Sequence, residues 1–122
     1  MKRFIWLLLL CLPVGAFADH LDVIEVKLNE GCSFSEYLSI KDDFNSKWGA
    51  KNGYRAEVLM PVQSHNLVSL YWIGRSASTA AFGKAWDQWR TELSDPNSVA
   101  AKLWARFEAC SMNVGRRSYD VY

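Results

Sequence analysis

The sequence lacks the charge imbalance that marks proteins binding nucleic acid or anionic membranes. Its 122 residues contain 14 Lys and Arg against 13 Asp and Glu. A phosphate backbone or an acidic lipid surface is bound through basic runs or patches, and the part of the chain that follows the first few residues has none. We therefore expect no nucleic acid partner and no membrane attachment of the mature protein.

The sequence is also poor in residues that build metal, cofactor or nucleophilic sites. It has two histidines and three cysteines, with no CxxC and no Cys/His cluster, which argues against zinc and thioredoxin-type sites. A Gly-rich phosphate loop, a nucleophile elbow and a Ser/His/Asp set are missing as well. We expect no cofactor and no metal, and we expect His20 and His65 to lie in solvent.

Long hydrophobic runs are absent too. The one apolar run, residues 4–12, is too short to span a bilayer. It follows a basic start and precedes Ala16-Phe17-Ala18, which is the pattern of a secretory signal peptide. We predict cleavage after Ala18, giving a signal peptide (1–18) and a single domain (19–122) that is periplasmic or secreted.

Export leaves two cysteines, Cys32 and Cys110. An even number of cysteines in an oxidising compartment favours a disulfide between them. The alternative is a pair of separately buried thiols. In the chain-entropy model a bridge across this separation contributes about 4 kcal/mol.

Hydrophobic periodicity predicts four strands and three helical segments. The strands are expected at residues 23–28, 54–62, 66–74 and 114–122, and the helices at 33–48, from about 79, and from about 96 to 110. Ser33 and Ser78 are predicted as N-caps of the first two helices. Asp95 is predicted to cap the third helix, with Pro96 at its first position.

The order β-α-β-β-α-α-β is the ferredoxin-like split βαβ pattern with an extra helix in the second crossover. It predicts an α+β fold with a four-stranded antiparallel sheet and its helices on one face. The start of the first helix and the end of the last then meet at one end of the sheet. This topology brings Cys32 and Cys110 together, independently of the argument from compartment.

The strand predicted at residues 66–74 is apolar on both of its sides. Val68, Leu70 and Trp72 are assigned to the helix side, which leaves Leu67, Tyr71 and Ile73 for the open side. In element order and length the chain resembles the dimeric α+β barrel superfamily, in which two such sheets pack face to face. The resemblance implies a homodimer, with these candidate interface residues: Leu67, Tyr71, Ile73, Glu25 and Arg55.

The same resemblance implies a pocket between the sheet and the helices. The residues that match its lining are aromatic: Trp72, Phe82, Trp86, Trp89 and Tyr37, with Phe44 as a further candidate. Such a pocket suits a flat, apolar ligand; the alternative is that these side chains only fill the core. Haem-degrading relatives use a histidine in the second helical region, and residues 79–111 contain none.

A second candidate site is the polar group expected on the open face of the sheet. Its members are Glu25, Lys27, Arg55, Glu57, Ser69, Tyr71 and Arg116. Opposite charges on neighbouring strands favour cross-strand ion pairs. The alternative is that Glu25 and Glu57 serve as acid and base.

Two functions follow from these patterns. The first is a non-catalytic, exported homodimer that binds a small apolar ligand. The second is a cofactor-independent, monooxygenase-like enzyme that acts on an aromatic substrate in the cleft between sheet and helices. A cavity of several hundred cubic ångströms in this cleft would favour the enzyme, and a filled core would count against it.

Overall fold

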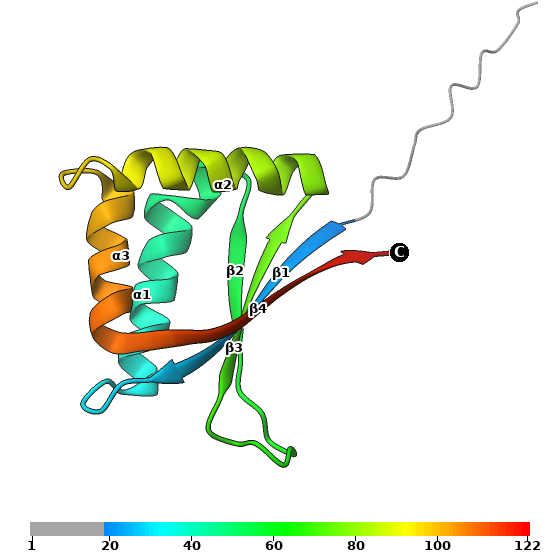
Figure 1. Cartoon of the computed structure of the whole chain (residues 1–122), viewed down its shortest axis with the longest axis vertical. Helices are drawn as coiled ribbons and strands as arrows, with labels where there is room; N and C mark the ends of the chain where they lie inside the picture. The colour runs from blue at the N-terminus through cyan, green and yellow to red at the C-terminus, as the bar shows by residue number, and fades with distance from the viewer. Residues whose placement is uncertain (1–18) are drawn as a thin grey trace, which may run out of the picture.

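The computed structural model describes residues 19–122, so the predicted signal peptide lies outside the described residues. The elements occur in the predicted order (Figure 1). They are β1 (Asp19–Leu28), α1 (Phe34–Lys47), the 3-10 turn η1 (Gly49–Lys51), β2 (Arg55–Leu59), β3 (Leu70–Ser76), α2 (Thr79–Leu93), α3 (Val99–Cys110) and β4 (Ser111–Val121). No helix within residues 19–122 is long and apolar enough to cross a membrane.

The four strands form one antiparallel sheet in the order β2-β3-β1-β4. The helices cover one face; α1 and α3 run side by side, and α2 runs across one end of them (Figure 1). Because side chains alternate along a strand, Asp22, Ile24 and Val26 of β1 face the helices. Glu25 of β1 and Tyr71 of β3, which are paired, face the open side.

Serine caps begin all three helices. Ser33 and Ser78 each accept a hydrogen bond from the main-chain N–H three residues later, at 3.1 and 3.0 Å, as predicted. The predicted cap of α3 is wrong: Ser98, and not Asp95, starts this helix. Asp95 instead accepts a bond from the N–H of Asn97 (2.9 Å), which holds the turn between α2 and α3.

The third strand is shorter than predicted. The side chain of Asn66 accepts hydrogen bonds from the N–H groups of Val68 and Ser69 (3.0 and 3.3 Å), and such a bond pattern holds the chain in a turn. Leu67 and Val68 therefore lie in the connection before β3, with 60% and 72% of their surface exposed. Assigning Val68 to the helix side was wrong.

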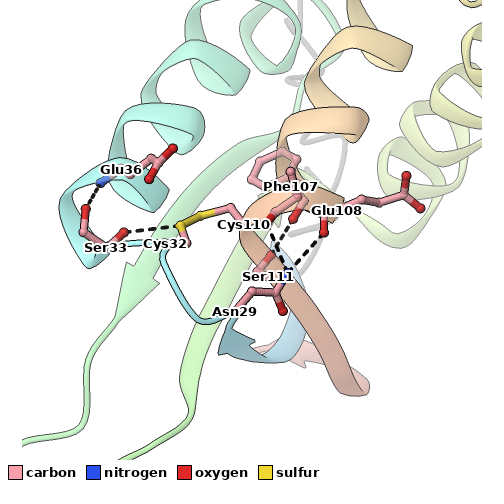
Figure 2. The surroundings of a disulfide bond; sticks show 9 residues. Asn29, Cys32, Ser33, Glu36, Phe107, Glu108, Cys110 and Ser111 are labelled. Atoms are coloured by element: carbon pink, nitrogen blue, oxygen red, sulfur yellow. Dashed lines mark hydrogen bonds between the residues drawn. A yellow bond between two sulfur atoms is a disulfide. The ribbon is translucent and has the colours of Figure 1, made fainter.

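A disulfide joins Cys32, just before α1, to Cys110, the last residue of α3, as predicted (Figure 2). Asn29 reinforces the same corner of the molecule. Its side-chain amide donates to the carbonyl oxygens of Glu108 and Ala109, both at 3.2 Å. Carbonyls in the last turn of a helix lack partners within the helix, so Asn29 satisfies two of them.

The core between sheet and helices is built from aromatic side chains. The Phe44 ring lies at its centre and makes edge-to-face contacts with Tyr54, Trp72 and Trp89, at centroid distances of 5.6, 5.1 and 5.6 Å. Contacts of this geometry are favourable beyond the area that they bury. They hold the rings in fixed positions around the cavity described next.

Candidate functional site

The core is not completely filled. A cavity of about 210 Å³ lies between the sheet and the helices. It is lined by all the aromatic residues predicted for the pocket: Trp72, Phe82, Trp86, Trp89, Tyr37 and Phe44. An engineered apolar cavity of about 150 Å³ is enough to bind benzene, so this one has room for a slightly larger ring compound.

The cavity reaches solvent beside β4. Trp104, Asn113 and Arg116 line it and are exposed, whereas Tyr37, Phe44 and the other residues deeper in the wall are buried. Strand β4 is exposed along nearly its whole length. The mouth therefore lies between β4 and the helices α2 and α3.

One buried polar cluster interrupts the apolar wall, and its centre is Asp22. The Asp22 carboxylate has no exposed surface. It accepts two hydrogen bonds from Arg116, from Nε at 2.7 Å and Nη2 at 2.6 Å, and one from the Tyr54 hydroxyl at 2.9 Å. The indole N–H of Trp72 donates to the same hydroxyl at 2.9 Å. The Asp22 carboxylate, the Tyr54 hydroxyl and the Trp72 indole N–H thus all have partners, as buried polar groups require.

A glycine makes this cluster possible. Gly74 of β3 lies opposite Asp22 of β1 and Ala56 of β2. A Cβ atom at position 74 would overlap the hydroxyl end of Tyr54. Because Gly74 has no side chain, the Tyr54 ring can lie against the sheet and reach Asp22.

The protonation states in the cluster follow from burial. Burial, and next the negative charge of Asp22, raise the pKa of Tyr54 well above the ordinary tyrosine range, so its hydroxyl stays protonated and donates. Burial works to lower the pKa of Arg116, but the hydrogen bonds and charge of Asp22 outweigh it and raise the pKa. The guanidinium also lies over the Trp86 ring, with Cζ 4.2 Å from the centroid.

Tyr37 places a second phenol in the wall of the cavity. Its side chain is almost fully buried, and its hydroxyl makes no hydrogen bond within residues 19–122. Burial raises the pKa of Tyr37 well above the ordinary range. This hydroxyl is therefore a neutral donor and acceptor in the wall of the cavity.

The titratable groups of the cavity wall are one carboxylate, one guanidinium and two phenols among the described residues. Asp22, its only carboxylate among the described residues, is held by Arg116 and Tyr54. The raised pKa values of Tyr37 and Tyr54 keep both phenols from acting as bases near neutral pH. Within residues 19–122, no group of three or more His, Cys, Asp or Glu side chains could hold a metal ion.

Comparison with known proteins gives matches in structure. No protein-family model matches the sequence, and no curated protein matches it. SnoaB of Streptomyces nogalater, a cofactor-independent oxygenase, superposes with a TM-score of 0.55 at 13% identity, covering 86% of this chain and 94% of its own. The chain has a ferredoxin-like α+β fold.

Two further solved structures share less of the geometry. A dimeric protein of unknown function and ferredoxin-like fold from Bacteroides fragilis NCTC 9343 has a TM-score of 0.44 at 16% identity, over 84% of this chain and 95% of its own. PA3566 from Pseudomonas aeruginosa has a TM-score of 0.48 at 14% identity, over 88% and 95%. At such identities the similarity to SnoaB concerns the fold alone.

Several polar residues of the open face are paired with one another, whereas Lys27 is exposed. Ser69 donates to Glu25 at 2.6 Å, and Glu57 contacts Arg75 and Arg55 at 3.6 and 3.8 Å. Strand β3 separates Glu25 on β1 from Glu57 on β2. The Arg75–Glu57 contact is a cross-strand ion pair of the kind that the sequence predicts, whereas Arg55 and Glu57 lie on the same strand.

Arg116 does not belong to this group. It was predicted on the open face, but it faces the helices and binds Asp22. The reason is an irregularity in the pairing of β1 with β4: Glu25 pairs with Gly115, whereas the next residue, Val26, pairs with Asn113. The bulge at Val114 lets Asn113 and Arg116 both line the cavity, although residues three apart on a regular strand face opposite ways.

The candidate interface residues fall into two sets. Tyr71, Ile73, Glu25 and Arg55 lie on the open face, as predicted. Leu67 lies in the exposed connection before β3 and outside the sheet.

His20 is buried, which corrects the prediction that it lies in solvent; His65 is exposed. β1 begins at Asp19, earlier than the pattern suggested, so His20 faces the helices. Its Nδ1 lies 3.3 Å from the Asp120 carboxylate and 3.3 Å from the Thr79 hydroxyl. Its ring stacks on Phe82 at 4.6 Å. His20 packs against the first turn of α2 and does not line the cavity.

The sequence interpretation missed Asp22 and Tyr54 and placed Arg116 on the wrong face of the sheet. One signal for Asp22 was available in the sequence. Ile24 and Val26 face the helices, and every second residue of a strand faces the same way, so Asp22 should face the helices too. An inward-facing Asp requires a cation or several donors. Which cation meets it depends on the pairing of β1 with β4, at the other end of the chain.

Proposed function

We propose that this protein is an exported, non-catalytic homodimer that binds a planar, largely apolar ligand in the cavity between its sheet and its helices. One observation carries the proposal: the wall is made largely of aromatic rings, and its one carboxylate among the described residues, Asp22, is satisfied within the protein. A ligand would displace water from apolar surface without breaking the Asp22 contacts. Burial of this kind is the main source of affinity in small-molecule sites.

A direct test is titration of the purified protein with 2-methylnaphthalene, followed by isothermal titration calorimetry and by tryptophan fluorescence. Trp72, Trp86 and Trp89 line the cavity, so binding should change their emission. Saturable binding at one site per chain supports the proposal. No binding at the solubility limit of the compound would overturn it.

A matched pair of variants tests the location of the site. Ala85 is buried and lines the cavity, so Ala85→Leu should fill part of it and weaken binding. Ala80 lies on the same helix and is exposed, so Ala80→Leu should bind like the parent protein. Equal binding by the two variants would place the ligand elsewhere.

The alternative function is a cofactor-independent oxygenase. Two observations favour it over a purely structural domain: the core holds a cavity, and SnoaB, an oxygenase of this kind, shares the fold. Its weakness is that no described residue of the cavity is available as a base. Oxygen uptake with electron-rich phenols and hydroquinones as substrates, compared between the parent protein and Ala85→Leu, decides between the two functions. Uptake that depends on the open cavity would establish the enzyme.

The dimer and the compartment are part of the proposal. The open face combines apolar Val23, Tyr71 and Ile73 with charged residues around them, and an apolar centre with a polar rim is typical of an interface. The disulfide fits an oxidising compartment. Native mass spectrometry of protein recovered from the producing cell would report the dimer, the bridge and the cleavage after Ala18 together. A reduced monomer that keeps residues 1–18 would overturn all three.

A further inference from the structure

Some polar atoms of the cavity have no hydrogen-bond partner within residues 19–122. Most of these atoms are hydrogen-bond donors. The one carboxylate of the wall, Asp22, has both oxygens occupied: Oδ1 accepts from Arg116 Nε, and Oδ2 accepts from Arg116 Nη2 and from the Tyr54 hydroxyl. The Tyr54 hydroxyl in turn accepts from Trp72. A ligand that offers a donor, such as an ammonium group, would find no open carboxylate.

Arg116 is the first available donor. Nε and Nη2 bind Asp22, and Nη1, with its two N–H groups, has no bond to the described chain. The guanidinium cannot turn away easily, since it is held by two bonds on one edge and lies over the Trp86 ring at 4.2 Å. Its side chain is 38% exposed at the mouth, so an incoming anion reaches it without breaking the Asp22 pair.

Tyr37 is the second available donor. It belongs to the wall that α1 contributes, whereas Arg116 belongs to the wall of β4. Its side chain is almost fully buried, and its hydroxyl makes no hydrogen bond to the described residues. A hydroxyl that lines the cavity without a protein partner can donate to a ligand or to water.

We propose that the ligand of this cavity is an aromatic carboxylate of one or two rings. The rings occupy the space between the tryptophans, and the carboxylate accepts hydrogen bonds from Arg116 Nη1 at the mouth or from Tyr37 within the wall. Arginine is suited to this role because its planar fork binds one carboxylate, Asp22, and presents further N–H groups to another. The inference rests on the proposed function and adds the chemical class of the ligand.

The test compares three compounds that share one ring system: 2-naphthoate, 2-methylnaphthalene and 2-naphthylmethylammonium. Calorimetry should give an affinity for naphthoate about tenfold higher than for methylnaphthalene, because a bond between charged groups is added. The ammonium compound should bind more weakly than methylnaphthalene. If methylnaphthalene binds and naphthoate binds no more tightly, this inference fails and the proposed function stands. If none of the three binds, both fail.

Two variants locate the donors. Tyr37→Phe removes a hydroxyl with no partner in the described chain, so folding should be unaffected, and naphthoate affinity should fall by about threefold to tenfold if that hydroxyl takes part. The double variant Asp22→Asn/Arg116→Gln keeps the shape of the pair and removes both charges. It should lose the preference for naphthoate over methylnaphthalene while still binding methylnaphthalene. A preference that persists in both variants would show that the carboxylate is bound by other groups and would overturn the assignment.

Discussion

The two faces of the sheet carry ion pairs of the same residue types, but they are built differently. On the helix face, Arg116 holds the fully buried Asp22 through two bonds of 2.6 and 2.7 Å. On the open face, Arg75 and Arg55 approach Glu57 only to 3.6 and 3.8 Å, and their side chains are 44% and 77% exposed. Surface pairs contribute little to stability, whereas breaking a buried pair leaves an uncompensated charge. Burial, more than the identity of the partners, decides what each pair does.

The largest expected effect is on the free energy of unfolding when one arginine is removed from each face in turn. Arg116→Ala leaves the buried Asp22 carboxylate with only the Tyr54 hydroxyl as a partner, so the free energy of unfolding should fall by about 3 kcal/mol. Arg75→Ala on the open face should change it by no more than about 0.5 kcal/mol. Urea denaturation measures both. Similar losses in the two variants would remove the distinction between the faces.

Alkaline pH should lower the free energy of unfolding because two phenols are buried on the helix face. Burial raises the pKa of Tyr37 and Tyr54, so above about pH 10 they ionise in the unfolded chain and stay protonated in the folded one. The unfolded state then binds fewer protons, and stability falls as pH rises, by up to about 2.7 kcal/mol per pH unit for the two groups. The contribution is fully present below pH 10. Urea denaturation at several alkaline pH values measures this slope, and Tyr37→Phe should halve it; an unchanged slope would assign the effect to other groups.

The same substitution, glycine to alanine, should have different effects on stability at Gly74 and at Gly115, which both lie in the sheet. Gly74→Ala would force the Tyr54 ring away from Asp22 and should cost about 2 kcal/mol. At Gly115, an added Cβ would meet only the Glu25 side chain, at 3.7 Å, which is ordinary contact. Gly115→Ala should therefore leave the melting temperature nearly unchanged. A destabilisation of the same size at both positions would mean that Tyr54 is not the cause.

The smallest effect on the folded chain is expected from Tyr71→Lys on the open face. Tyr71 pairs with Glu25 across β1 and β3, so a lysine there has a partner and the monomer should keep its stability. The proposed dimer should weaken by about 30-fold or more, as for loss of a central interface residue. Sedimentation velocity measures this, with Ala80→Lys on the exposed side of α2 as control. A dimer that survives Tyr71→Lys would place the interface elsewhere.

Much of the fold could be predicted because its signals are local. The serine caps at Ser33 and Ser78 and the Cys32–Cys110 bridge follow from short patterns, compartment and element order. The start of β3 was mistaken because the side chain of Asn66 holds Val68 in a turn. Apolar content alone does not reveal that competition.

The aromatic half of the site was predictable and its polar half was not. Rings at helical spacing point to one face of α2, whether or not they enclose a cavity. The Asp22–Arg116 pair instead depends on strand register across 94 positions. It also depends on the bulge at Val114, which directs Arg116 inward. Bulges leave no clear mark in a single sequence.

The space that Gly74 leaves for Tyr54 has a consequence for how this chain can drift in evolution. In strand β3, Arg75 can change freely, but position 74 admits other residues only after position 54 has become smaller. Relatives should therefore show linked identities: glycine at 74 wherever a tyrosine at 54 meets an acid at 22, and a larger residue at 74 only where that tyrosine is gone. Such linked positions would let the polar half of this cavity be recognised from sequence alone in distant relatives that share only the fold.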